Sequence, residues 1–176
     1  MERITSREVY SGPIASVRID SFRYADGSES ERQIVSHPGA VVALAVEGES
    51  IWLVRQPREA VGEPALLELP AGKLDVEGET HLECMQRELE EEIGMQAEGW
   101  RELKRFYMSP GFTEEQVTLF LATGLSDVHR HEPDPSERIE VVEWPLARLD
   151  AAIAACEDAK SLIGLLMLPR ALGSTG

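Results

Sequence analysis

The sequence has few cysteines and no long hydrophobic run. Its two cysteines, Cys84 and Cys156, match no metal-binding spacing, and we expect buried thiols rather than a disulfide. The longest apolar run, residues 40–46, is far too short to cross a bilayer. Residues 1–7 lack the apolar stretch of a secretory signal. We therefore expect a cytoplasmic protein that makes no membrane contact.

Positive charge is also scarce. The chain has 17 Lys and Arg residues against 32 Asp and Glu residues, a formal net charge of −15. Proteins that bind nucleic acids need a basic surface, so we expect no nucleic-acid partner. The same charge would repel an anionic small molecule unless metal ions and a few arginines attract it locally.

What the chain does contain is the composition of a folded domain. Its 176 residues are 43% hydrophobic and 28% charged, which is enough to bury a core. Residues 26–27 and 47–49 indicate turns between strands, and residues 70–72 indicate a loop. The patterns predict helices at 80–93, 146–156 and 159–168, and strands at 17–24, 31–37, 41–46, 51–55, 66–69, 101–108, 117–122 and 139–144. Strands with helices on either side predict an α/β fold, a mixed sheet between helices.

The helix predicted at 80–93 has clear ends and a core-facing stripe. Thr80 and Glu83 form a capping-box pattern at its start, and Gly94 ends it. The apolar residues that helical spacing places on one face are Leu82, Met85, Leu89 and Ile93.

Three glutamates share a neighbouring arc of this helix. Glu88, Glu91 and Glu92 lie at positions i, i+3 and i+4, so their carboxylates converge. Like charges so placed repel, and a bound divalent cation would reverse the sign of that interaction because hard cations prefer oxygen ligands. A solvated acidic face is the alternative for an isolated run of this kind. The flanking residues argue against it, because a glycine-containing loop precedes the helix and Glu79 lies eight positions before Arg87.

The stretch from Gly72 to Met95 resembles the signature of the Nudix hydrolases, G-x5-E-x7-R-E-U-x-E-E-x-G-U, where U is aliphatic. One position departs, because six residues rather than five separate Gly72 from Glu79; the extra residue lies in the loop and leaves the helix spacing unchanged. The matching positions are Glu79, Arg87, Glu88, Leu89, Glu91, Glu92, Gly94 and Met95.

This resemblance implies the Nudix α/β/α sandwich with a mixed sheet, and a Mg²⁺ or Mn²⁺ site. Arg87 is expected to pair with Glu79 and hold the loop against the helix. The implied metal ligands are Glu88, Glu91, Glu92 and the backbone carbonyl of Ala71.

The segment 109–115, S-P-G-F-T-E-E, resembles a loop of the ADP-ribose pyrophosphatase branch of this family. The resemblance implies that Glu115 takes part in catalysis or in metal binding. Glu114 is adjacent and is the alternative by one position, while Glu91 is a further candidate for the base that activates water. Taken alone, such a segment would be read as an exposed acidic turn.

Residues 53–62 and 67–72 are similar to another run of the same branch. Arg55 and Arg58 are the expected clamps on a diphosphate, because a guanidinium matches phosphate oxygens with two hydrogen bonds. Pro57 replaces the usual aromatic residue, which weakens the case for ring stacking there. Glu68 is a candidate contact to the nucleoside.

The branch also implies an organisation and a reaction. Residues 1–37 would form a small antiparallel sheet that crosses to a second subunit in a homodimer, and residues 38–176 would form the Nudix domain. The expected reaction is metal-dependent hydrolysis of ADP-ribose, a nucleoside diphosphate sugar, to AMP and ribose 5-phosphate. Alternatives are another ADP-sugar, a GDP-sugar or a dinucleotide, or a sensor that binds a nucleotide-sugar without cleaving it. The intact acidic residues argue against the sensor.

Overall fold

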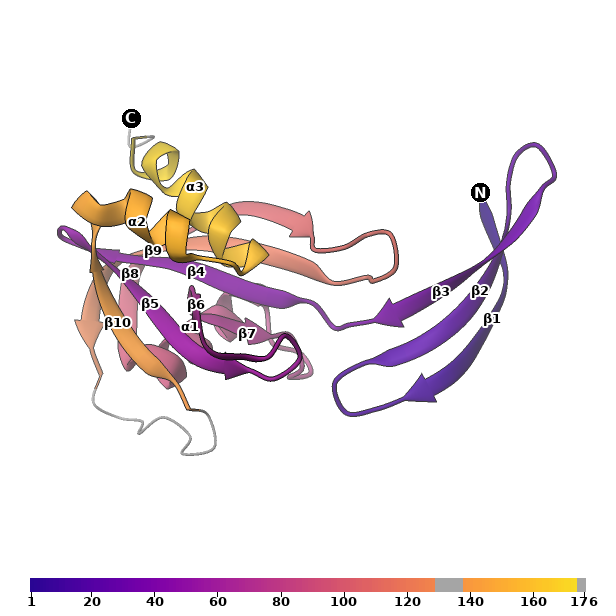
Figure 1. Cartoon of the computed structure of the whole chain (residues 1–176), viewed down its shortest axis with the longest axis horizontal. Coiled ribbons are helices and arrows are strands. Elements are labelled where there is room, and N and C mark those ends of the chain that lie inside the picture. The colour runs from indigo at the N-terminus through magenta and orange to yellow at the C-terminus, as the bar shows by residue number, and fades with distance from the viewer. Residues whose placement is uncertain (129–137, 174–176) are drawn as a thin grey trace. The chain divides into compact units, whose positions relative to one another are not determined.

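The chain forms two compact units in the computed structural model, which describes residues 1–128 and 138–173 (Figure 1). One unit comprises Met1–Gly39 together with Phe106–Gln116. The other comprises Ala40–Arg105 and the described part of Val117–Gly176. The expected division of the chain lay between residues 37 and 38, whereas the first unit also includes Phe106–Gln116.

The first unit contains a three-stranded antiparallel sheet in the order β1-β2-β3. Its strands are β1 (Glu2–Ser11), β2 (Ser16–Arg23) and β3 (Glu29–Ser36). The predicted turn at residues 26–27 joins β2 to β3, and Gly27 adopts a φ of +82° that favours glycine. β1 was not predicted from the sequence. All ten of its residues are exposed, so no buried face marks the strand.

The second unit is built on a seven-stranded mixed sheet in the order β10-β5-β4-β9-β8, with β6 on β5 and β7 on β4. β4 runs parallel to β9 and antiparallel to β5, which confirms the mixed sheet. One expectation needs correction: part of the predicted loop at 70–72 is β7, with Gly72 opposite Val41 of β4. The strands are β4 (Ala40–Glu47), β5 (Ser50–Arg58), β6 (Glu63–Glu68), β7 (Ala71–Lys73), β8 (Met95–Tyr107), β9 (Gln116–Asp127) and β10 (Glu140–Pro145).

Helices cover both faces of this sheet, which confirms the α/β/α sandwich (Figure 1). Val41, Ala43 and Ala45 of β4 pack with α1 (His81–Ile93). Leu44 points to the opposite face, because side chains alternate along a strand, and lies beside Gly164 of α3 (Ala159–Gly173). The helix predicted at 146–156 begins as a 3₁₀ turn, η1 (Leu146–Arg148), and continues as α2 (Leu149–Ala155). Of the described helices, none has the length and apolar character needed to cross a membrane.

The ends of α1 match the sequence prediction, and its buried face matches in part. The Thr80 side chain accepts a hydrogen bond from the Glu83 N–H, the Glu83 carboxylate accepts from the Thr80 N–H, and Gly94 ends the helix with φ +68°. The expectation for Leu82 was wrong, because its side chain is exposed and Cys84 is buried in the core instead. The predicted residues that are buried are Met85, Leu89 and Ile93.

Both cysteines are buried and free, as predicted. The Cys84 thiol donates to the Lys73 carbonyl at 3.3 Å, which links α1 to β7. Burial raises the pKa of Cys84 to about 12, so this thiol stays protonated and unreactive at neutral pH.

Candidate active site

The carboxylates of Glu88 and Glu92 lie where α1 packs against β7. Glu92 is 5% exposed, and its Oε2 accepts a hydrogen bond from the Ala71 N–H at 2.9 Å. A Cβ atom built on Gly72 would overlap the side chain of Glu88. Glycine is needed at this position because the Glu88 side chain comes so close to the backbone of β7. The structure thus brings Glu88 and Glu92 to the backbone of Ala71 and Gly72, while their role as metal ligands stays a prediction.

Arg87 connects three glutamates, one before α1 and two on it. Its Nε and Nη2 donate to the two carboxylate oxygens of Glu79 at 3.0 and 3.1 Å, the ion pair that the sequence analysis expected. Its Nη1 donates to Glu88 at 2.8 Å and to Glu91 at 2.9 Å. Hydrogen bonding to Glu79 is the largest cause of the raised pKa of Arg87, and Arg87 in turn lowers the pKa of Glu79. The guanidinium thereby offsets repulsion among the glutamates.

The donor atoms of this site suit a hard divalent cation. Glu88 and Glu92 are one helical turn apart beside the backbone of β7, and all the groups they offer are oxygen donors of the kind that Mg²⁺ takes. Glu91 is less engaged in this group, because its side chain is 45% exposed and turned to Arg87. Within residues 1–128 and 138–173, no three His, Cys, Asp or Glu side chains converge closely enough to form a ready-made metal cluster. Further ligands would therefore include backbone carbonyls such as that of Ala71, or the phosphates of a substrate.

Arg58 and Glu68 lie together in a buried network of charges. Glu68 is 1% exposed, and Arg58 donates to both of its carboxylate oxygens, at 2.5 and 2.9 Å. Lys160 of α3 donates to Glu68 at 2.6 Å and to Asp158 at 2.9 Å. Burial raises the pKa of Glu68, but the hydrogen bonds and charges of Arg58 and Lys160 outweigh it and leave the pKa below its usual value.

Ser161 extends this network to the turn that leads into β7. Its hydroxyl accepts a hydrogen bond from the Leu69 N–H at 2.8 Å and donates to Asp158 at 2.5 Å. The start of α3 thus holds the backbone two residues before Ala71. The sequence pattern predicted a helix at 159–168 but not the roles of Lys160 and Ser161. These residues lie 92 positions beyond their partners, so no local pattern could reveal the contacts.

Arg55 is half-buried on β5, opposite Leu67 of β6. Among the described residues its side chain forms no ion pair, in contrast to Arg58. The register between β5 and β6 shifts between Gln56 and Arg58, at Pro57. Proline has no N–H to donate to a neighbouring strand, which accounts for the irregularity.

Glu114 and Glu115 belong to the first unit, and their surroundings differ. Arg18 of β2 donates two hydrogen bonds to the Glu114 carboxylate, at 2.8 and 2.6 Å. The carboxylate of Glu115 has no hydrogen bond or ion pair within the described part of the chain, and its backbone N–H donates to the Thr113 hydroxyl at 3.2 Å. Of the two neighbouring candidates, Glu115 therefore has the available carboxylate. Arg18 was not predicted as a partner, because it lies 96 positions before Glu114.

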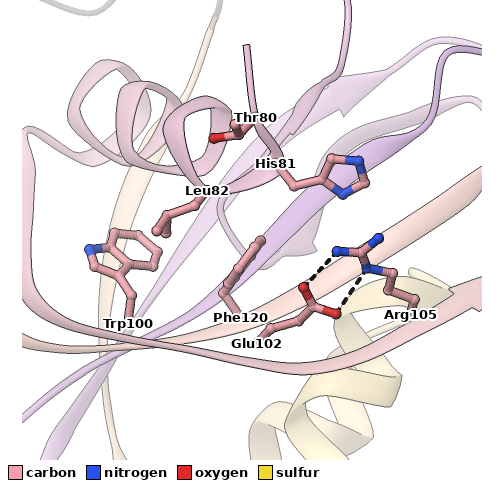
Figure 2. Close-up of a pocket in the computed structure, with 7 residues that line it drawn as sticks. All are labelled: Thr80, His81, Leu82, Trp100, Glu102, Arg105 and Phe120. Atoms are coloured by element: carbon pink, nitrogen blue, oxygen red, sulfur yellow. Dashed lines mark hydrogen bonds and ion pairs between the residues drawn. The ribbon is translucent and has the colours of Figure 1, made fainter.

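A surface pocket of about 500 Å³ lies at the other end of α1, and Figure 2 shows the side chains around it. Trp100 and Phe120 meet edge to face in its wall, with ring centroids 6.1 Å apart. Glu102 and Arg105 pair with each other across its rim. None of the site residues predicted from the sequence lines it. Its lining residues are Thr80, His81, Leu82, Trp100, Glu102, Arg105 and Phe120.

A mixed sheet between helices, with helix glutamates packed against a glycine-containing strand, is the arrangement of the Nudix class. The chain belongs to the NUDIX domain family, which matches residues 35–163. It is 37% identical over 163 residues to an ADP-ribose pyrophosphatase of Mycobacterium tuberculosis, covering 92% of this chain and 78% of the relative. It is 40% identical over 145 residues to an ADP-ribose pyrophosphatase of Bacillus subtilis, covering 81% of this chain and 77% of the relative.

A solved structure shares the whole fold. The crystal structure of an ADP compounds hydrolase superposes with a TM-score of 0.85 over 99% of this chain and 95% of the other, at 21% identity. Both units thus have counterparts in a known architecture.

Proposed function

We propose that this chain hydrolyses the diphosphate bond of a nucleoside diphosphate sugar, and that ADP-ribose is its substrate, with AMP and ribose 5-phosphate as products. The observation that carries the proposal is the packing of Glu88 and Glu92 against Ala71 and Gly72. It occurs in a chain whose relatives in M. tuberculosis and B. subtilis are ADP-ribose pyrophosphatases.

The reaction would depend on Mg²⁺, with Mn²⁺ as a substitute. Glu88, Glu92 and the Ala71 carbonyl would hold the ion, with Glu91 as an additional ligand. A bound cation would offset the charge of the diphosphate and make a water molecule more acidic. The Arg87–Glu79 pair would keep the loop and α1 together when the carboxylates of Glu88 and Glu91 leave Arg87 to bind the ion.

Other side chains would bind the substrate and move a proton. Arg55 and Arg58 would contact the diphosphate, and Glu68 would orient Arg58 and lie near the nucleoside. Glu115 would accept a proton from the attacking water, ahead of Glu91. Glu114, which is engaged by Arg18, is the less suitable base.

A substrate panel with a matched pair of variants tests this function. ADP-ribose, GDP-mannose and diadenosine polyphosphates would be incubated with Mg²⁺ and the products identified by mass. We expect ADP-ribose to be cleaved fastest. Glu88→Gln should lower turnover by about 100-fold, because the variant would bind the metal ion more weakly. Glu90→Gln serves as the control, because Glu90 lies on the same helix and contacts Gln96.

Two outcomes would count against the proposal. Equal turnover by Glu88→Gln and Glu90→Gln would remove the metal site from the reaction. Faster cleavage of GDP-mannose or of a dinucleotide would support the proposed type of reaction but show that ADP-ribose is not the preferred substrate.

We propose further that the chain works as a homodimer in the cytoplasm, without nucleic acid or membrane as a partner. The sheet of the first unit supports the dimer, because it carries the exposed apolar side chains of Ile4, Val9 and Tyr10, and Ile14 is exposed in the turn between β1 and β2. Two free cysteines suit a reducing compartment. Light scattering in solution would test the dimer, since a monomer at micromolar concentration would exclude it. Fractionation of cells would test the compartment.

A further inference from the structure

The turn 109–115 is fastened to the N-terminal sheet through its backbone. The Val35 N–H of β3 donates to the Phe112 carbonyl at 2.8 Å, and the Val35 carbonyl accepts from the Glu114 N–H at 3.1 Å. These two bonds flank Thr113, which forms a parallel bridge with Val35. The backbone of the turn therefore lies along the edge of β3 just before Glu114 and Glu115.

Arg18 adds a side-chain connection at the same point. Its two terminal nitrogens hold the Glu114 carboxylate in the paired geometry that makes arginine–carboxylate contacts directional. Its Nε donates to Asp20 at 2.9 Å, and the buried Asp20 also accepts from the Ser6 hydroxyl at 2.6 Å. The Arg18 side chain is only 17% exposed, and a further hydrogen bond to Ser36 restrains it. Residues of the sheet thus orient the Arg18 side chain independently of Glu114.

The restraint on Glu114 passes to the next residue. The Glu115 N–H donates to the Thr113 hydroxyl, and the Glu115 carbonyl accepts from the Met108 N–H at 3.1 Å. With its backbone held on both sides and Glu114 bound to Arg18, Glu115 has few directions open to its side chain.

We propose that Arg18 is a positioning residue for Glu115. By binding Glu114 it fixes the turn 109–115 and so sets the direction in which the Glu115 carboxylate points. This role rests on the proposed function, in which Glu115 accepts the proton. It gives the N-terminal sheet a part in turnover, in addition to any contact between subunits.

Another ion pair of the same sheet supplies the control. Arg23 and Glu29 join β2 to β3 at 2.7 Å, and both side chains are about half exposed. Among the described residues, no hydrogen bond or ion pair joins these two side chains to the turn 109–115, so Arg23→Met removes a comparable ion pair and should leave Glu115 unaffected.

The test is a double-mutant cycle on steady-state hydrolysis of ADP-ribose with Mg²⁺. We expect Arg18→Met and Glu114→Gln each to lower kcat by about 10- to 100-fold with KM changed less than about twofold, because small displacements of a catalytic group are costly. Arg18→Lys should recover part of the loss. Glu115→Gln should lower kcat by about 100-fold or more. Adding Arg18→Met to Glu115→Gln should lower kcat no further, because Arg18 acts only through Glu115.

Each result decides between a positioning role and a merely structural one. A folding defect in Arg18→Met would multiply the loss of Glu115→Gln, and that result would overturn the proposal. Glu114→Gln keeps the test valid if Arg18→Met does not fold, because it leaves Arg18 and Asp20 paired. If the wild type hydrolyses ADP-ribose and Glu114→Gln is equally active, the positioning role of Arg18 is rejected and the proposed function stands. Failure of the wild type on every substrate of the panel would reject both.

Discussion

At the scale of single residues, Gly72 is constrained by a neighbouring side chain. An alanine there would place its methyl group where the Glu88 side chain lies. We predict that Gly72→Ala folds but displaces Glu88. Its affinity for Mg²⁺ should fall by about 10-fold or more, the range found for changes beside metal ligands. The measurement is the Mg²⁺ concentration that gives half-maximal turnover, together with direct titration of Mn²⁺.

Gly173→Ala is the matched control. Among the residues that the structure describes, none has an atom within 4 Å of a Cβ built on Gly173, which ends α3. The two variants should differ in metal affinity while their circular dichroism spectra agree. Unchanged metal affinity in Gly72→Ala would show that Glu88 does not need this close approach.

Residues with local partners were the ones that the sequence could identify. Arg87 and Glu79 are eight positions apart, and their ion pair followed from spacing on a known pattern. Arg18 reaches Glu114 across 96 positions, and Lys160 reaches Glu68 across 92. Such contacts depend on how strands and helices come together in space, so one sequence read by local pattern cannot reveal them.

At the scale of elements, the stability of α1 depends on its first turn. The Thr80 hydroxyl and the Glu83 carboxylate satisfy N–H groups that the helix leaves unpaired. We predict that Thr80→Ala lowers the free energy of unfolding by about 1 kcal/mol. That change corresponds to a fall of about 2–4 °C in Tm for a protein of this size. Thermal unfolding followed by circular dichroism would measure it.

Thr80→Ser keeps a hydroxyl at the cap and should retain most of the stability. Turnover at low temperature should be nearly equal in the two variants, because Glu88 and Glu92 lie in the second half of α1. A Thr80→Ala protein as stable as the wild type would mean that tertiary contacts alone hold the start of the helix.

The element with the clearest sequence signals was α1, whereas β1 and β7 were not predicted. α1 has caps at both ends and buries Met85, Leu89 and Ile93, so periodicity and capping agreed. β1 buries nothing and offered no alternation. β7 is three residues long, too short for a pattern, and exists because β4 provides a partner.

At the scale of the whole molecule, Glu68 links β6, β5 and α3 through Arg58 and Lys160. Its pKa in the folded protein lies below the ordinary value of 4.5. The network therefore contributes its full stability above pH 4.5 and loses it as pH falls through the folded pKa. We predict that wild type and Glu68→Gln differ most in free energy of unfolding near neutral pH. The difference should shrink as pH falls below 4.5, as urea unfolding at several pH values would show.

Glu29→Gln is the control for this series. Its partner Arg23 is about half exposed, and pairs of that kind contribute little. A constant gap between wild type and Glu68→Gln from pH 7 to pH 3 would show that the Glu68 charge is not what stabilises the fold.

The contact between Ser161 and Leu69 has a consequence for synthesis on the ribosome. Translation delivers the acidic helix long before Ser161, which lies 92 positions after Leu69. Until then the Leu69 N–H lacks its hydroxyl acceptor and Glu68 lacks Lys160, and unpaired groups of this kind are costly to bury. A nascent chain therefore cannot close the turn before β7 until α3 has emerged, so the onset of activity should follow the folding of α3.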